Sequence, residues 1–181
     1  MDITFALLIV YAVCVLGALC VAMGAAWSDW RSMTIPNCYS VIMIGLFCLG
    51  YGALALAGAA PAPWWDYVTS MAIVFFVTLA MFLVKAIGGG DSKFGAACAL
   101  WVGLGGLMPF LLVMMLVGMV LGICALLMRN RVVFFRAVPD GWVDRVQRGQ
   151  NAIPYGIAIT LGWLAGVPAG GLLDSLMAFF H

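Results

Sequence analysis

The chain has 181 residues, of which 66% are hydrophobic and only 8% are charged, and its net charge is +1. A soluble domain needs far more charged surface than this, so the composition excludes soluble folds and predicts an integral membrane protein. The few basic residues are explained by membrane topology, so nucleic acid is not expected as a partner.

The predicted fold is all-α: a polytopic membrane protein with six transmembrane helices, the fourth of them short, in a single domain over residues 1–181. The first three predicted spans are 3–27, 38–58 and 67–87, each long enough to cross a bilayer, which takes about 20 residues. The first run is not a signal peptide, because it lacks a basic start and its apolar stretch is too long.

The apolar run 94–128 carries no charge and is too long for one ordinary span. We expect a hairpin, because the stretch 103–109 supplies three glycines and a proline as turn residues. The hairpin leaves a fourth helix of about a dozen residues after Asp91, which is too short to cross the hydrocarbon core. The loop that carries Asp91 is therefore expected to dip below the membrane surface, supported by neighbouring helices.

The last part of the chain holds the only sizeable polar segment, 129–151. Within it, Trp142, Val143 and Val146 fall on one helical face, which suits a short interfacial helix. A sixth span, 153–177, follows. The role of the polar segment is left open by the sequence.

All basic residues fall in one set of predicted loops, and these loops are expected to be cytoplasmic by the positive-inside rule. They are Arg31, Lys85, Lys93, Arg129, Arg131, Arg136, Arg145 and Arg148. Both termini are then predicted to be periplasmic, which requires an even number of spans.

The available side chains exclude several catalytic mechanisms. The only histidine is the last residue, His181, and the chain has no glutamate. Mechanisms that pair Ser or Cys with His therefore have no histidine to use. No zinc-ligand cluster, paired C-x-x-C or phosphate-binding loop occurs, so we expect neither a metal nor another cofactor.

Two aspartates remain as candidate catalytic residues. Asp29 lies in Trp27-Ser28-Asp29-Trp30-Arg31, and Asp91 follows three glycines, both at the predicted cytoplasmic edge of an apolar span. An ionisable group at a bilayer is costly and therefore suggests a function. Two carboxyls that meet in a poorly solvated site share a proton, which is the minimum equipment of an aspartic protease.

Three other interpretations of these residues stay open. Asp29 can belong to an ordinary charged turn at the membrane surface, and Asp91 can cap the fourth helix. Alternatively, the protein is a small cation- or proton-coupled transporter whose intramembrane aspartates bind the ion. A non-enzymatic assembly scaffold needs no paired aspartates.

Three short motifs occur in order along the chain: Asp29 with Ile35-Pro36-Asn37, then Gly88-x-Gly90-Asp91-x-Lys93, then Ile153-Pro154-Tyr155-Gly156. This combination resembles the type IV prepilin peptidase family, whose members are intramembrane aspartic proteases with a G-x-G-D motif. Larger members carry a cytoplasmic insertion with zinc-binding cysteine pairs and also N-methylate their product. This chain has neither, and it looks like the short Flp/Tad-type members, the CpaA or TadV group.

The resemblance implies an endopeptidase of the bacterial inner membrane, without N-methyltransferase activity, whose active site lies near the cytoplasmic face. Its substrates would be Flp-type prepilins and pseudopilins, cut just before their hydrophobic helix, and the pilus assembly machinery would be a further partner. Asp29 and Asp91 would be the catalytic acids. The residues expected to bind substrate or shape the site are Gly88, Gly90, Lys93, Pro36, Asn37, Pro154 and Tyr155. For Lys93, a simple anchor at the lipid headgroups is the open alternative.

Overall fold

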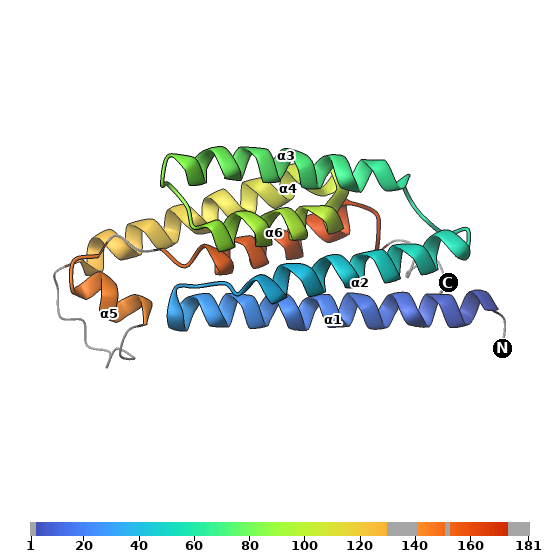
Figure 1. Cartoon of the computed structure of the whole chain (residues 1–181), viewed down its shortest axis with the longest axis horizontal. Coiled ribbons are helices and arrows are strands. Elements are labelled where there is room, and N and C mark those ends of the chain that lie inside the picture. The colour runs from blue at the N-terminus through green and yellow to red at the C-terminus, as the bar shows by residue number, and fades with distance from the viewer. Residues whose placement is uncertain (1–2, 130–140, 151–152, 174–181) are drawn as a thin grey trace.

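The protein folds as an elongated helical bundle (Figure 1). A computed structural model describes residues 3–129, 141–150 and 153–173, and its regular elements there are all helices, which confirms the all-α prediction. In chain order they are α1 (Ile3–Ser32), α2 (Asn37–Leu56), α3 (Trp64–Leu83), α4 (Gly89–Met128), α5 (Trp142–Gln147) and α6 (Tyr155–Ala169).

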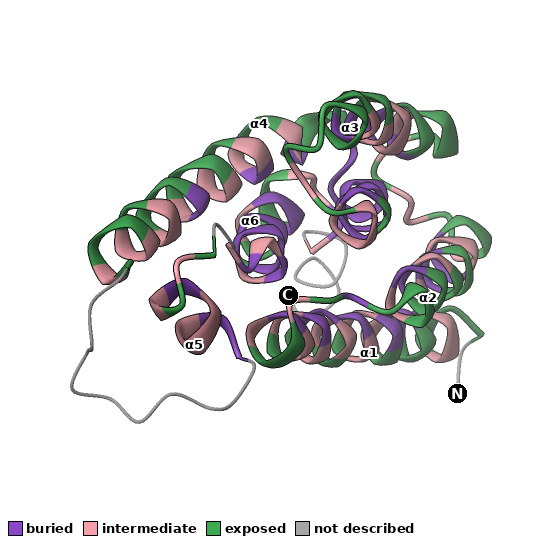
Figure 2. Ribbon diagram, turned by 60° about the vertical axis from the view of Figure 1, so that its left-hand side comes forward, coloured by how far each residue is buried: buried purple, intermediate pink, exposed green. Residues whose placement is uncertain are grey.

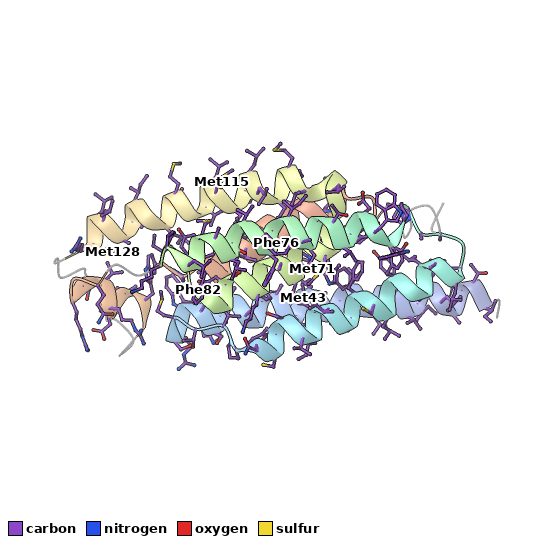
Figure 3. The ribbon with its side chains drawn as sticks, turned by 45° about the horizontal axis from the view of Figure 1, so that its top comes forward. Met43, Met71, Phe76, Phe82, Met115 and Met128 are labelled. Carbon is purple, nitrogen blue, oxygen red and sulfur yellow. The ribbon has the colours of Figure 1, made fainter. Side chains whose placement is uncertain are left out.

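The outer surface of the bundle is apolar. Phe76 on α3 and Met115 on α4 are 67% and 58% exposed, and Figure 3 shows such side chains along the outside of the helices. In the described part, four helices, α1 to α4, are long and apolar enough to cross a membrane, whereas α6 is a shorter apolar helix of 15 residues. The protein is therefore a membrane protein, and the count of six spans stays a prediction.

Helix α4 is a hairpin of two helical arms, 89–102 and 104–128, which run in opposite directions (Figure 1). The chain reverses at Gly103, where φ is +60° and ψ is −175°. The predicted hairpin is therefore present, and its turn is the single residue Gly103, because the helix resumes directly at Leu104. The Asp66 carboxylate accepts the Leu104 N–H at 2.9 Å and so caps the second arm.

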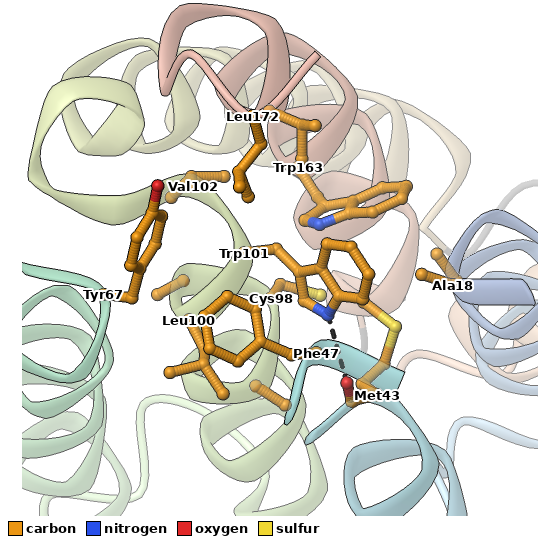
Figure 4. Packing of buried hydrophobic residues seen from close by; sticks show 14 of the residues in the cluster. Ala18, Met43, Phe47, Tyr67, Cys98, Leu100, Trp101, Val102, Trp163 and Leu172 are labelled. Carbon is orange, nitrogen blue, oxygen red and sulfur yellow. Dashed lines mark hydrogen bonds between the residues drawn. The ribbon is translucent and has the colours of Figure 1, made fainter. Parts of the chain in front are cut away.

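The first arm of α4 lies at the centre of the molecule. Every residue from 94 to 103 is buried, which suits a helix that is apolar on all sides (Figure 2). Trp101 anchors this core: its ring packs edge-on against Trp163 and Phe47, and its indole N–H donates to the Met43 carbonyl at 3.1 Å (Figure 4). Asp91 stands in the first turn of this central arm.

Glycines allow α6 to pack closely on both arms of α4. A Cβ at Gly166 would lie 2.7 Å from Val102 Cγ1, and a Cβ at Gly162 would lie 2.6 Å from the Phe110 carbonyl oxygen. Small residues let helix backbones approach in this way inside membranes. This contact packs α6, which begins at Tyr155, against α4.

Several predicted boundaries differ from the observed helices. The first predicted span ends at residue 27, but α1 continues to Ser32 and carries Asp29, because nothing before Pro36 breaks the helix. Helix α3 ends at Leu83 rather than at 87, because the chain turns at Lys85 with φ +60°. Helix α6 starts at Tyr155 and ends at Ala169, short of the predicted 153–177, of which 174–177 lie outside the described residues. The predicted interfacial helix is α5, with Trp142 and Val146 buried.

Candidate active site

Asp29 continues the buried face of α1. Ala18, Ala22, Ala25 and Asp29 follow one another at spacings of four, three and four residues, which places them on one side of a helix. The three alanines are fully buried, and Asp29 is only 3% exposed. The helical pattern therefore turns the carboxylate inward at the end of an apolar stripe.

A backbone amide from the start of α6 holds the Asp29 carboxylate. The Gly156 N–H donates to Asp29 Oδ2 at 2.7 Å. A Cβ at Gly156 would lie 2.9 Å from Asp29 Cβ and 3.0 Å from Oδ2, so only glycine fits this approach without movement. A buried carboxylate needs such a donor, because an unpaired buried charge is costly.

Asp91 is half-buried in the first turn of α4. Its Oδ2 accepts the Gly88 N–H at 3.1 Å, which fixes the glycine turn against the carboxyl. A Cβ at Gly90 would lie 2.8 Å from the Ile35 carbonyl oxygen, and a Cβ at Gly156 would lie 3.0 Å from Ile35 Cδ1. Ile35 thus touches the segments that hold both aspartates.

Both aspartates line one open cleft of about 780 Å³. Gly88 and Tyr155, two of the residues predicted to shape the site, also line it. The remaining lining residues are mostly apolar, with polar or basic side chains at three positions: Met33, Ala86, Ile87, Gly122, Ala125, Leu126 and Ile153, with Lys85, Arg129 and Gln150. The structure therefore brings the two predicted acids to a common space large enough for a peptide segment.

The other predicted site residues hold the helices around the cleft and are not among its lining. Lys93 Nζ donates to Asn37 Oδ1 at 3.2 Å and joins the start of α4 to the start of α2. Pro36 and Pro154 precede the first residues of α2 and α6, and Pro154 is fully buried. Proline suits this place because its fixed φ starts a helix at no cost in hydrogen bonds.

Backbone strain in the described residues gathers at the same cleft. Outside glycine, positive φ values occur there at Met33 (φ 55°) and Lys85 (φ 60°), and both residues line the cleft. Such conformations are unfavourable for residues with a Cβ and cluster at functional sites. This independent observation points to the same end of the molecule as the aspartates.

The sequence did not single out Lys85, Arg129, Met33 or Gly156 as site residues. The two basic residues follow the ends of apolar runs, so the charge rule explained them as topology markers. Gly156 was visible as the end of the Ile153–Gly156 motif, but nothing in the sequence places its N–H on Asp29, 127 residues away.

The arrangement equips the cleft for acid–base chemistry. Each carboxyl has one oxygen held by a backbone N–H, and the described residues offer no protein partner for the other oxygen, Oδ1. Within the described residues no three His, Cys, Asp or Glu side chains gather closely enough to hold a metal ion. Two carboxyls with free oxygens in one cleft can position a water molecule and exchange protons with it.

Comparison with known proteins identifies one family. The model of the type IV leader peptidase family matches residues 14–123, which is more than half of the chain and includes both Asp29 and Asp91. Neither a curated protein nor a solved structure showed significant similarity to the chain.

Proposed function

Because the chain belongs to the type IV leader peptidase family, we propose that it is an aspartic endopeptidase whose catalytic residues are Asp29 and Asp91. The observation that carries this proposal is their position in one cleft, each with one oxygen held by a glycine N–H. No other pair of carboxyls among the described residues lines that cleft.

The proposed substrates are Flp-type prepilins and pseudopilins, which lose their leader at the cytoplasmic face of the inner membrane. The charge pattern supports this orientation, because the described basic residues lie at the cleft end of the bundle. The chain has no cytoplasmic insertion with cysteine pairs, so we propose that it does not methylate its product. Association with pilus assembly proteins belongs to the same proposal.

In the proposed mechanism, the two carboxyls share one proton. The ionised carboxyl takes a proton from a water molecule, which then attacks the scissile carbonyl carbon. The protonated carboxyl donates its proton to the carbonyl oxygen. The carboxyl that took the proton from water then donates it to the leaving nitrogen as the C–N bond breaks, and the other carboxylate takes back a hydroxyl proton from the tetrahedral intermediate. Close carboxyls in a poorly solvated site favour this single-proton state, because two neighbouring charges repel each other.

The other predicted site residues have positioning roles in this proposal. Gly88 lines the cleft and lets the substrate backbone approach Asp91, because it has no side chain. Gly90 lets the start of α4 pack closely on the Ile35 carbonyl. Pro36, Asn37 and Lys93 fix the start of α2 against the start of α4, and Pro154 and Tyr155 fix the start of α6.

The test is cleavage of a Flp-type prepilin from the same genome, co-expressed in membranes and followed by its change in size. We expect Asp29→Asn and Asp91→Asn each to lower the rate by at least about 10²-fold, the usual contribution of an acid–base group. Asp144→Asn is the matched control, because Asp144 lies on α5, outside the cleft lining, and pairs with Arg148. All variants must be inserted at equal levels.

If the Asp29→Asn and Asp91→Asn variants both still cleave the prepilin, the proposed catalytic dyad is wrong. In that case the transporter returns as the leading alternative, and ion flux becomes the quantity to measure. One observation already argues against it: the helix break of α4 at Gly103 lies at the far end of the first arm, away from Asp91 in the first turn of that arm (Figure 1). Transporters place such breaks at the ion site.

A further inference from the structure

The cleft contains two cations as well as two carboxyls. Lys85, just after α3, and Arg129, just after α4, line the same cavity as Asp29 and Asp91, and both side chains are exposed at its mouth. They come from the ends of different helices. A peptide that lies across the two aspartates therefore passes within reach of positive charge from two elements.

Lys85 occupies a backbone position that favours glycine. Helix α3 ends with the Ala86 N–H donating to the Met81 carbonyl at 2.8 Å and the Lys85 N–H donating to the Phe82 carbonyl at 2.9 Å. This is the bond pattern of a Schellman cap, whose left-handed residue is usually glycine. Lys85 adopts that conformation with φ +60°, so the lysine lies at a position where its side chain lowers the stability of the fold.

Neither cation has an ion-pair partner within the described part of the chain. Among the described residues, no ion pair joins Lys85 or Arg129 to a carboxylate, and Asp29 and Asp91 accept backbone N–H groups instead. Lys93 differs, because its Nζ already donates to Asn37. The two cleft cations are therefore available to an anion that comes from outside the chain.

We propose that Lys85 and Arg129 bind the carboxylate of an acidic side chain on the prepilin segment that enters the cleft. This inference rests on the proposed function and adds a specificity-determining site to it. A substrate carboxylate fits better than a lipid phosphate, because both cations line the cavity that holds the catalytic carboxyls. Lysine and arginine bind carboxylates through charge-assisted hydrogen bonds, which are the stronger kind.

A purely structural role for the two cations makes a different prediction. Basic residues at helix C-termini interact favourably with the helix dipole, and long basic side chains also reach lipid headgroups. Both roles concern stability or insertion, and neither depends on which residues surround the cut in the substrate. The test therefore varies the enzyme and the substrate together.

The experiment measures kcat/KM in membranes for wild type, Lys85→Gly and Arg129→Gln, after Asp29→Asn has established that cleavage depends on the proposed dyad. Lys85→Gly keeps the left-handed backbone and removes only the side chain. Each enzyme is tested on a Flp-type prepilin and on versions in which single Asp or Glu residues near the cut become Asn or Gln. Arg148→Gln is the control, because Arg148 lies outside the cleft lining and pairs with Asp144.

We expect each cleft variant to lower kcat/KM about tenfold on the unmodified prepilin, the scale of one hydrogen bond to a charged group. For one neutralised prepilin, wild type should show a similar decrease in kcat/KM, and the two cleft variants should cleave that prepilin no more slowly than wild type does. Arg148→Gln should cleave as wild type does, and Lys85→Arg should restore most of the activity.

Three results would overturn the proposed site while leaving the protease activity intact. In the first, neither variant lowers kcat/KM. In the second, the variants lower kcat/KM by the same factor on every neutralised prepilin as on the unmodified one, and in the third, their loss of kcat/KM disappears in membranes without anionic lipids. The last result would assign the cations to a lipid phosphate. Failure of wild type to cleave any prepilin would instead remove the proposed function and this site together.

Discussion

Gly156 controls the position of Asp29 through both its N–H and its missing side chain. The N–H donates to Asp29 Oδ2, and a Cβ at this position would lie 2.9 Å from Asp29 Cβ. We expect Gly156→Ala to displace the carboxylate and to lower the cleavage rate at least about tenfold, since a hydrogen bond to a charged group is worth that much. Cleavage in membranes, normalised to the inserted protein, measures the effect.

Gly45→Ala is the matched control for this prediction. Gly45 lies in α2, and a Cβ there has no neighbouring atom within 4 Å. Alanine is more favourable than glycine inside a helix by about 0.5–1 kcal/mol, so this variant should be at least as stable as wild type and cleave as fast. If Gly156→Ala also cleaved at the wild-type rate, the placement of Asp29 by Gly156 would be wrong.

Gly103 is the single residue that turns the two arms of α4 into a hairpin. Its φ of +60° disfavours any side chain, and a Cβ would lie 2.7 Å from Asp66 Oδ2, the oxygen that caps the second arm. We expect Gly103→Ala to combine backbone strain with loss of this cap and to destabilise the protein by about 2–4 kcal/mol. Thermal unfolding in detergent measures the change.

A second glycine separates the two causes. Gly58, after α2, also has a positive φ of +70°, but a Cβ there meets no atom within 4 Å. Gly58→Ala should therefore cost only the backbone strain, about 1–2 kcal/mol. Equal losses of stability for Gly58→Ala and Gly103→Ala would mean that the contact with Asp66 contributes nothing.

The contact between α4 and α6 is also sensitive to added side-chain volume. A Cβ at Gly166 would lie 2.9 Å from the Gly106 carbonyl oxygen, which belongs to a helix backbone and cannot move aside alone. We expect Gly166→Ala to destabilise the protein by about 1–3 kcal/mol, as overpacking usually does. Gly105→Ala, whose Cβ would lie 3.5 Å from its nearest neighbour, should unfold at the wild-type temperature.

The elements show which features the sequence could predict. Local patterns were enough for the hairpin in α4 and for Asp29 and Asp91 as a candidate pair. The one-residue turn was missed because Asp66, which caps it, lies 38 residues away in the sequence. The contact of Gly156 with Asp29 and the cleft position of Lys85 likewise depend on packing between distant helices, which no local pattern encodes.

At the scale of the whole molecule, charge and site lie at the same end. Helix α1 has 30 residues and is therefore about 45 Å long, whereas the hydrocarbon core is about 30 Å thick. One end of α1 must extend beyond the core, and Asp29 and Arg31 lie near its C-terminal end. The start of α4 and the end of α3 lie at that same end (Figure 1). The cleft is thus expected at a membrane surface, where a leader peptide can reach it from water.

The orientation of this end gives the last prediction. In a variant whose six cysteines are replaced by alanine, Pro61→Cys and Ala86→Cys place single exposed thiols in the connections at opposite ends of the bundle. If the basic end is cytoplasmic, a membrane-impermeant maleimide should label Pro61→Cys in intact spheroplasts and Ala86→Cys only after permeabilisation. Labelling in the reverse order would put the two aspartates at the periplasmic face, where a leader still in the cytoplasm could not reach them.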